Sequence, residues 1–123
     1  MVYEQTGQYT PLFRFPGGSS NTVSSFNEGI MSRLTASMNA MGYQYFDWNV
    51  DCDDAGKTHT SWGVLKNIKE GCEGQDYCLV LQHDVKDYSV AALRDVIEWG
   101  LENGYRFETL SMTAPTAHHS VAN

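Results

Sequence analysis

The apolar residues of this chain alternate between short runs and longer stretches with helical spacing. Four short runs predict strands at residues 12–15, 43–51, 77–82 and 105–110. Three longer stretches predict helices at residues 22–41, 61–71 and 89–103. Strand and helix thus alternate three times before a last strand, which is typical of an α/β fold with parallel strands and right-handed crossovers, a βαβαβαβ unit.

The helical stripes also predict which side chains face the core. The first helix should bury Phe26, Ile30, Leu34, Met38 and Met41. The second should bury Trp62, Leu65, Ile68 and Cys72. The third should bury Val90, Leu93, Ile97 and Leu101. Ser25 with Glu28 fits a capping box, and Gly42 and Gly104 are natural helix stops.

The strands suggest an incomplete sheet. Along residues 43–51, apolar Phe46, Trp48 and Val50 alternate with Asp47, Asn49 and Asp51, which predicts one apolar and one acidic face. Residues 77–82 are apolar throughout, as expected for a strand that is covered on both faces. Four such strands make a thin sheet with adhesive open edges, so the pattern favours a piece of a barrel.

Composition narrows the class of partner. The chain has 123 residues, enough for one domain, and a net charge of −7, which argues against nucleic acid or an anionic membrane as the main partner. No apolar run reaches membrane-spanning length and none follows a basic N-terminus, so we expect no export signal in this chain. Cys52, Cys72 and Cys78 have neither the spacing of a zinc site nor a C-x-x-C motif, and we expect buried thiols. A disulfide between Cys72 and Cys78 is an alternative only in an oxidising compartment.

Chemically useful side chains follow three consecutive strands. Arg14 precedes a Pro-Gly-Gly turn, carboxylates follow the second strand, and His83 follows the third. The carboxylates are Asp51, Asp53 and Asp54. Because the carboxyl ends of parallel strands meet at one edge, we expect these groups to lie together. Taken singly, each has a structural alternative: an ion pair for Arg14, a solvated loop for the aspartates and a buried partner for His83.

Three motifs carry a family resemblance. "FRFPGG", "DWNVDCDD" and "LVLQHD", in this order, together with "WGLENGY" and "AHHSVAN", resemble the second half of polysaccharide deacetylases, the NodB-homology carbohydrate esterases. The chain is most similar to deacetylases of peptidoglycan or chitooligosaccharides. The resemblance implies an irregular (β/α) barrel of the NodB-homology type that hydrolyses N-acetyl groups of N-acetylglucosamine units. It also implies a divalent metal, usually zinc, an Asp base and a His acid.

The resemblance assigns catalytic roles by motif. It implies that His83 is the general acid that protonates the leaving amine. Arg14 would orient the catalytic Asp, and the backbone N–H of Gly17 would help to hold the oxyanion. Asp54 would hold the arginine, and Asp51 is the earlier Asp of that motif.

The resemblance also suggests substrate contacts. Leu81 corresponds to the apolar wall beside the acetyl methyl group, and Pro16 begins a turn whose bare backbone a substrate can approach. Where the family often has a tryptophan after the motif Asp, this chain has Ala55. Trp48 or Trp62 would then supply that wall of the groove.

Two motifs of the family are absent from this sequence. Thr-Phe-Asp-Asp-Gly would supply the base and a metal ligand, and His-Ser/Thr-x-x-His would supply two metal histidines. His118 and His119 are adjacent, and adjacent histidines rarely bind one metal. We therefore expect residues 1–123 to be the C-terminal portion of a deacetylase domain, inactive alone and binding no metal by itself.

Three functional hypotheses remain, in order of preference. The first is this partial deacetylase, whose partner is an N-acetylglucosamine glycan rather than nucleic acid or membrane, whose parent acts at the cell surface, and whose open barrel edges favour homo-oligomers. The second is a non-catalytic carbohydrate-binding or assembly module that uses Trp48 and Trp62. The third is a self-contained metal hydrolase built from the three strand-end aspartates, His83 and His59.

Overall fold

The computed structural model describes residues 2–123, which form two compact units. The first, unit 1, contains the residues up to Asp47 together with Leu110–Asn123. The second, unit 2, is the continuous segment Trp48–Thr109. None of the helices in residues 2–123 combines the length and the apolar character that crossing a membrane requires.

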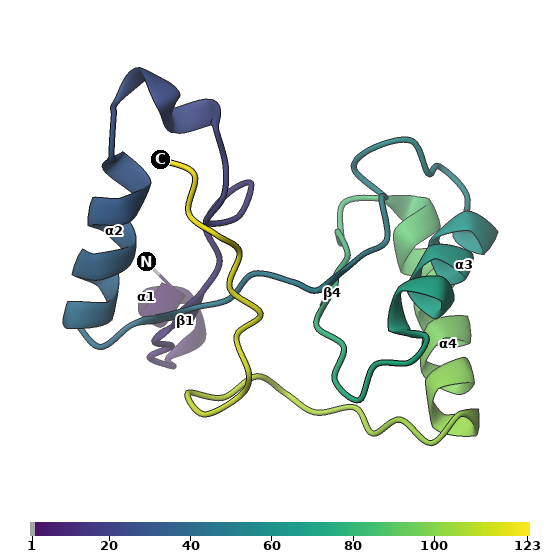
Figure 1. Ribbon diagram of the computed structural model, residues 1–123. Coiled ribbons are helices and arrows are strands. Elements are labelled where there is room, and N and C mark those ends of the chain that lie inside the picture. The colour runs from purple at the N-terminus through teal and green to yellow at the C-terminus, as the bar shows by residue number, and fades with distance from the viewer. Residues whose placement is uncertain (1) are drawn as a thin grey trace. The chain divides into compact units, whose positions relative to one another are not determined.

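Unit 1 pairs two short parallel strands beside a helix (Figure 1). Its elements are α1 Val2–Thr6, β1 Leu12–Phe13, the 3₁₀ helix η1 Val23–Phe26, α2 Ile30–Ala40 and β2 Gln44–Tyr45. Leu12 lies opposite Gln44 in the β1–β2 ladder. The buried centre is formed by Phe15, Met31 and Tyr45, with Val121 packed against them. A residue near the end of the sequence thus helps to build the core around β1.

Asn123 holds the beginning of α2. Its side-chain Oδ1 accepts the N–H of Gly29 at 2.9 Å, and its backbone oxygen accepts the N–H of Ser32 at 2.8 Å. Its amide group donates to the backbone oxygens of Ser24 and Asn27. Helix N-termini leave N–H groups without partners in the helix, so Asn123 caps α2 from far along the chain.

Unit 2 packs two helices against a second pair of parallel strands. Its elements are β3 Val50–Asp51, α3 Ser61–Cys72, β4 Val80–Leu81 and α4 Asp87–Glu102. Val50 lies opposite Val80 in the ladder, and α3 and α4 lie side by side (Figure 1). The buried core consists of Val50, Cys52, Val64, Ile68, Cys72, Ala92 and Val96. Asp51 and Leu81, the last residues of the two strands, are therefore neighbours at one edge.

The predicted α/β class with parallel strands is confirmed, but the strands are shorter than predicted. Residues 43–51 form two strands, β2 and β3, which belong to different sheets and different units. Within the described structure, residues 105–110 are neither helix nor strand, although Tyr105 packs on the unit 2 core and donates its hydroxyl to the oxygen of Cys72 at 2.8 Å. Three of the four apolar runs therefore contain strands, which are shorter than predicted, whereas residues 106–110 are exposed.

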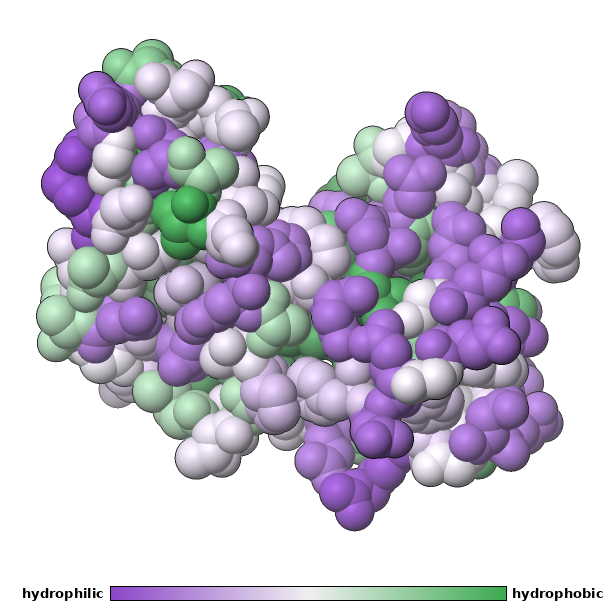
Figure 2. Space-filling view, viewed as in Figure 1, coloured by the Kyte–Doolittle hydropathy of each residue, from purple (hydrophilic) through white to green (hydrophobic). Residues whose placement is uncertain are grey.

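The predicted inward faces are wrong in part for all three helices. On α4 the buried residues are Ser89, Ala92, Val96 and Gly100, while the predicted stripe is exposed, Val90 by 53% and Leu101 by 60%. Small residues let two helices approach closely, and this favoured the small-residue face over the bulkier one. On the face seen in Figure 2, green apolar residues lie among purple polar ones.

The other two helices show smaller departures. Trp62 is 71% exposed on α3, where Val64 is buried instead, and Ile68 and Cys72 are buried as predicted. Phe26 lies outside α2 and is exposed, whereas Met31 is buried. The single helix predicted over residues 22–41 is interrupted, because Gly29 has a φ of +71° at the N-cap of α2. The Ser25–Glu28 capping box is therefore wrong.

Candidate functional site

The candidate site of unit 2 is a buried aspartate bonded to a histidine. Asp54 follows β3 and His83 follows β4, so pairing of the two strands brings both residues to the same edge. The Asp54 Oδ1 atom lies 2.7 Å from His83 Nδ1, and Asp54 Oδ2 accepts the backbone N–H of His83 at 2.7 Å. Asp54 is 1% exposed, whereas the His83 side chain is 27% exposed. Part of the His83 ring is therefore exposed to solvent, while its Nδ1 atom contacts the buried carboxylate of Asp54.

The ionisation of Asp54 fixes the tautomer of His83. Burial raises the pKa of the Asp54 carboxyl, but hydrogen bonds from Ser89 and His83 outweigh it and hold the pKa below its usual value. An ionised carboxylate only accepts hydrogen bonds, so His83 Nδ1 must carry the proton. Nε2 then remains the nitrogen for chemistry outside the pair, which is the arrangement of a histidine prepared for acid or base catalysis.

The carboxylate of Asp54 has partners within its own unit. The resemblance implied that Asp54 holds Arg14, but the contacts of its carboxylate are His83 and Ser89, both in its own unit. Arg14 belongs to unit 1, so its contact with Asp54 stays a prediction. The role that the structure supports for Asp54 is to orient and stabilise His83.

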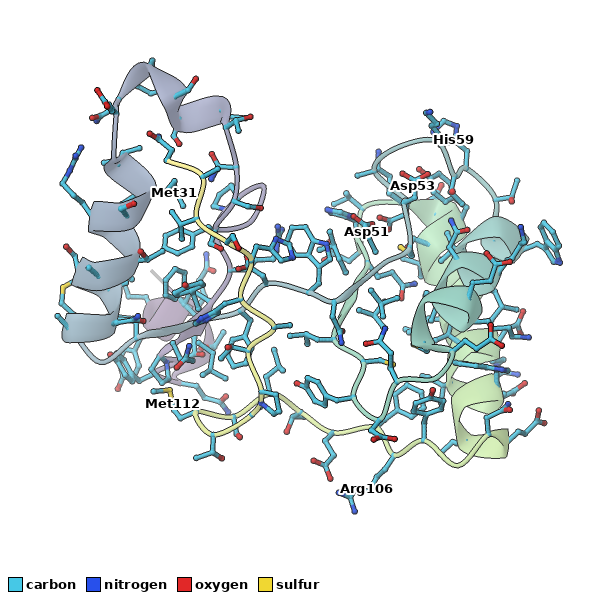
Figure 3. The ribbon with its side chains drawn as sticks, viewed as in Figure 1. Met31, Asp51, Asp53, His59, Arg106 and Met112 are labelled. Carbon is cyan, nitrogen blue, oxygen red and sulfur yellow. The ribbon has the colours of Figure 1, made fainter. Side chains whose placement is uncertain are left out.

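The other carboxylates of the motif shape the loop between β3 and α3 (Figure 3). Asp51 Oδ1 accepts the N–H of Asp53 at 2.8 Å, and Asp53 Oδ2 accepts from Lys57 N and the Thr58 hydroxyl. Asp53 has a φ of +59°, a conformation that aspartate adopts more readily than most residues. The ring of His59 bonds the backbone oxygen of Gly56 at 3.0 Å. These side chains stabilise the loop.

The third hypothesis, a self-contained metal hydrolase, finds no support in these contacts. Among residues 2–123 there is no group of three or more His, Cys, Asp or Glu side chains that could hold a metal ion. The residues described therefore do not fit the metal of the family as a complete ligand set.

Unit 1 carries the other motif residues on a tight turn. The N–H of Gly18 bonds the oxygen of Phe15 at 2.8 Å, and Gly17 has a φ of +72°. Proline followed by a residue with positive φ is typical of a type II turn, which favours glycine at that position. Arg14, Pro16 and Gly17 are exposed, and the guanidinium of Arg14 contacts the oxygen of Phe15 at 3.4 Å.

Asp47 is a buried carboxylate that the sequence pattern does not reveal. The alternation along residues 43–51 predicts it on the polar face of a strand, but it is 3% exposed. Its oxygens accept the N–H of Ser19 at 2.8 Å, the hydroxyl of Ser19 at 2.5 Å and the N–H of His119 at 2.9 Å. Burial raises the pKa of Asp47, but these hydrogen bonds outweigh it and keep the pKa below its usual value. The partner residues are remote in sequence, so no local pattern could have indicated this contact.

The adjacent histidines have structural contacts. The ring of His118 stacks on Tyr45 with centroids 3.8 Å apart, and its Nε2 lies 3.0 Å from the backbone oxygen of Tyr45. His119 Nδ1 lies 3.1 Å from the hydroxyl of Ser20. The two rings therefore have separate partners.

Of the remaining predicted residues, Leu81 ends β4 and is partly buried, and Trp48 is partly buried at the start of unit 2. Cys52, Cys72 and Cys78 are free thiols. Burial raises the pKa of Cys52 to about 11. Burial and a hydrogen bond with Cys78 raise that of Cys72 to about 12. Such thiols are poor nucleophiles near neutral pH.

Comparison with solved structures places these motifs in a known fold. The catalytic domain of a peptidoglycan N-acetylglucosamine deacetylase from Eubacterium rectale is 43% identical over 99% of this chain, with a TM-score of 0.95. A polysaccharide deacetylase from Bacillus cereus is 24% identical over 98% of the chain, with a TM-score of 0.73, and a Streptococcus mutans CE4 esterase is 24% identical over 86%, with a TM-score of 0.66. The last two show the fold alone.

The chain spans 56%, 55% and 47% of the lengths of these three proteins, respectively. No model of a protein family matches the sequence, and no curated protein matches it. The resemblance inferred from the motifs is nevertheless confirmed: in sequence and fold, this chain is similar to part of the catalytic domain of a peptidoglycan N-acetylglucosamine deacetylase.

Proposed function

We propose that this chain is part of a metal-dependent polysaccharide deacetylase and supplies its general acid, His83. The reaction would be hydrolysis of N-acetyl groups on an N-acetylglucosamine polymer, peptidoglycan or chitin oligosaccharides. The bond between His83 and the buried Asp54 is the observation that carries the proposal. The 43% identity to a peptidoglycan N-acetylglucosamine deacetylase supports the choice of substrate class.

His83 would act through Nε2. The protonated ring donates a proton to the amine nitrogen as the amide C–N bond breaks, and the neutral ring that results keeps its proton on Nδ1. The carboxylate of Asp54 accepts the Nδ1–H at 2.7 Å and holds the ring in place during the transfer. As the resemblance implies, the backbone N–H of Gly17 would bind the oxyanion and the guanidinium of Arg14 would orient the base.

The base and the metal ligands would come from outside the described residues. A divalent metal, which we propose to be zinc, would polarise the acetyl carbonyl and activate water when bound. Residues 2–123 hold no group that could bind it as a complete set, so the chain alone should not hydrolyse the amide. We also propose, as the resemblance implies, that the chain is part of a (β/α) barrel and that the parent enzyme acts at the cell surface.

A chimera tests this function. The matching portion of the Eubacterium rectale catalytic domain is replaced by residues 1–123, and acetate release from chitin oligosaccharides and peptidoglycan fragments is measured with added zinc. We expect the chimera to release acetate, its His83→Gln form to lose at least about 100-fold in rate, and the 123-residue chain alone to be inactive. A folded chimera that binds zinc and glycan but releases no acetate contradicts the proposal.

The second hypothesis, carbohydrate binding without catalysis, is favoured by one observation. Trp62 is 71% exposed on α3, and an exposed indole can stack on a sugar ring. The ammonium of Lys66 lies 5.9 Å from the centre of this ring. Glycan binding by the isolated chain that is lost in Trp62→Ala and insensitive to His83→Gln would support this function instead.

A further inference from the structure

Ser89 completes the hydrogen bonding of Asp54. It lies in the first turn of α4, its side chain is fully buried, and its hydroxyl lies 2.6 Å from Asp54 Oδ2. The pKa of Asp54 is below its usual value, so the carboxylate is ionised and the hydroxyl must donate to it. Asp54 therefore receives His83 Nδ1–H on one oxygen and two donors on the other.

We propose that Ser89 is a positioning residue: its hydroxyl fixes the plane of the Asp54 carboxylate, so that Oδ1 faces His83 Nδ1 and the histidine stays in one tautomer. A carboxyl group can rotate about its own bond, and the two contacts other than Ser89 that oppose this rotation both come from His83. The hydroxyl of Ser89 adds a donor from a separate element, α4.

Local helix capping does not account for the hydroxyl of Ser89. The N-cap residue of α4 is Lys86, whose side chain has no acceptor for the free N–H groups of the first turn. A serine hydroxyl in that turn can serve the helix, yet that of Ser89 points to a residue 35 positions away. The neighbouring Tyr88 donates its hydroxyl to the backbone oxygen of Asp54 at 2.7 Å. The first turn of α4 thus binds both the backbone oxygen of Asp54, through Tyr88, and its carboxylate, through Ser89.

The support is rigid because α4 is anchored in the core. Ala92 and Val96, on the same face as Ser89, are buried in the unit 2 core against α3. The backbone oxygen of Ser89 also accepts the side-chain amide of Gln82 at 2.6 Å, and Gln82 directly precedes His83. A displacement of this turn would therefore reach His83 through Asp54. The inference rests on the proposed function only where it gives His83 the role of acid.

Nuclear magnetic resonance of the full 123-residue chain, labelled with ¹⁵N in its histidines, tests the proposal. Wild type should show His83 as the Nδ1–H tautomer when neutral, with a slowly exchanging Nδ1 proton. In Ser89→Ala this proton should exchange with water roughly tenfold faster, the scale expected from the loss of one hydrogen bond to a charged group. Ser89→Thr keeps the hydroxyl and should stay near wild type. Ser61→Ala, on α3, is the matched control and should change nothing.

Three results would overturn the proposal. One is a folded Ser89→Ala chain whose Nδ1 proton exchanges at the wild-type rate. If that variant does not fold, Ser89→Cys keeps the volume with a weaker donor, and unchanged exchange in it is equally decisive. The third is a wild-type chain with His83 in the Nε2–H tautomer. None of these readings depends on hydrolysis, so an inactive chimera would refute the proposed function and leave the role of Ser89 standing.

Discussion

Replacement of Asp47 by Asn tests whether a buried carboxylate organises unit 1. Asp47 is 3% exposed and accepts three hydrogen bonds, two from Ser19 and one from the N–H of His119. Asn keeps one acceptor oxygen and turns an NH₂ group toward donors. A hydrogen bond to a charged group contributes about 1.5–3 kcal/mol, so the loss of two, partly offset by rotation of the Ser19 hydroxyl, should cost about 2–4 kcal/mol. Domains are typically stable by only about 5–15 kcal/mol.

The penalty should depend on pH. The hydrogen bonds of Asp47 keep its pKa in the folded chain below the unfolded value of about 3.9, although burial opposes them. Its stabilising contribution is therefore fully present above that value and disappears as the pH falls through the folded pKa. The difference between wild type and Asp47→Asn should accordingly shrink as the pH is lowered below about 4.

Urea unfolding followed by circular dichroism at pH 7 and pH 3 measures both effects. Hydrogen exchange by mass spectrometry should show faster exchange at residues 17–20 and 118–121 in the variant. Glu28→Gln, at an exposed carboxylate of the same unit, is the control and should change stability by less than about 0.5 kcal/mol. The reasoning is refuted by an Asp47→Asn chain as stable as this control at pH 7, or by a difference that grows in acid.

Three further predictions concern packing, capping and surface. Gly71→Ala should lower the thermal midpoint despite the better helix propensity of alanine, because the new Cβ would lie 2.6 Å from Val50 Cγ1. We expect a net loss of about 1 kcal/mol in the free energy of unfolding, and an increase in stability would contradict this reasoning. Asn123→Ala should cost about 1–2 kcal/mol through loss of the α2 cap, measured by urea unfolding, with faster amide exchange at the start of α2. The double variant Leu93→Lys, Leu101→Lys should change stability by less than about 0.5 kcal/mol and reduce self-association in analytical ultracentrifugation, whereas unfolding would show that this face is core.

The sequence predicted elements better than it predicted their faces. Periodicity located α3 and α4 to within two residues at either end, because long amphipathic stretches carry a strong signal. It chose the wrong face of α4, where Leu93 and Ile97 form a stripe as regular as the buried one through Ala92 and Val96. The buried face carries the smaller side chains, so hydrophobicity alone did not separate the two faces.

The sequence predicted those parts of the site that lie directly after strands. His83 and Asp54 follow consecutive strands of a parallel pair, so their proximity followed from topology. The contact of Asp54 with Ser89 was not predictable in this way, because a motif names a residue type and not the direction of its side chain. Ser89 and Asp47 were missed for another reason: each bonds a residue at least 28 positions away, and nothing in local sequence encodes such a pair.

The two units differ in how their residues are distributed along the chain. Unit 2 is one continuous segment, whereas unit 1 needs Asn123 at the start of α2 and His119 at Asp47, over sequence separations of 94 and 72 residues. Closing such long loops costs entropy before any contact is gained. During translation, unit 2 can therefore fold as soon as it leaves the ribosome, while the first 47 residues must wait for residues 110–123, which are made after unit 2. The order of folding would then run opposite to the order of synthesis, and unit 1 would be the part exposed to chaperones and proteases in the interval.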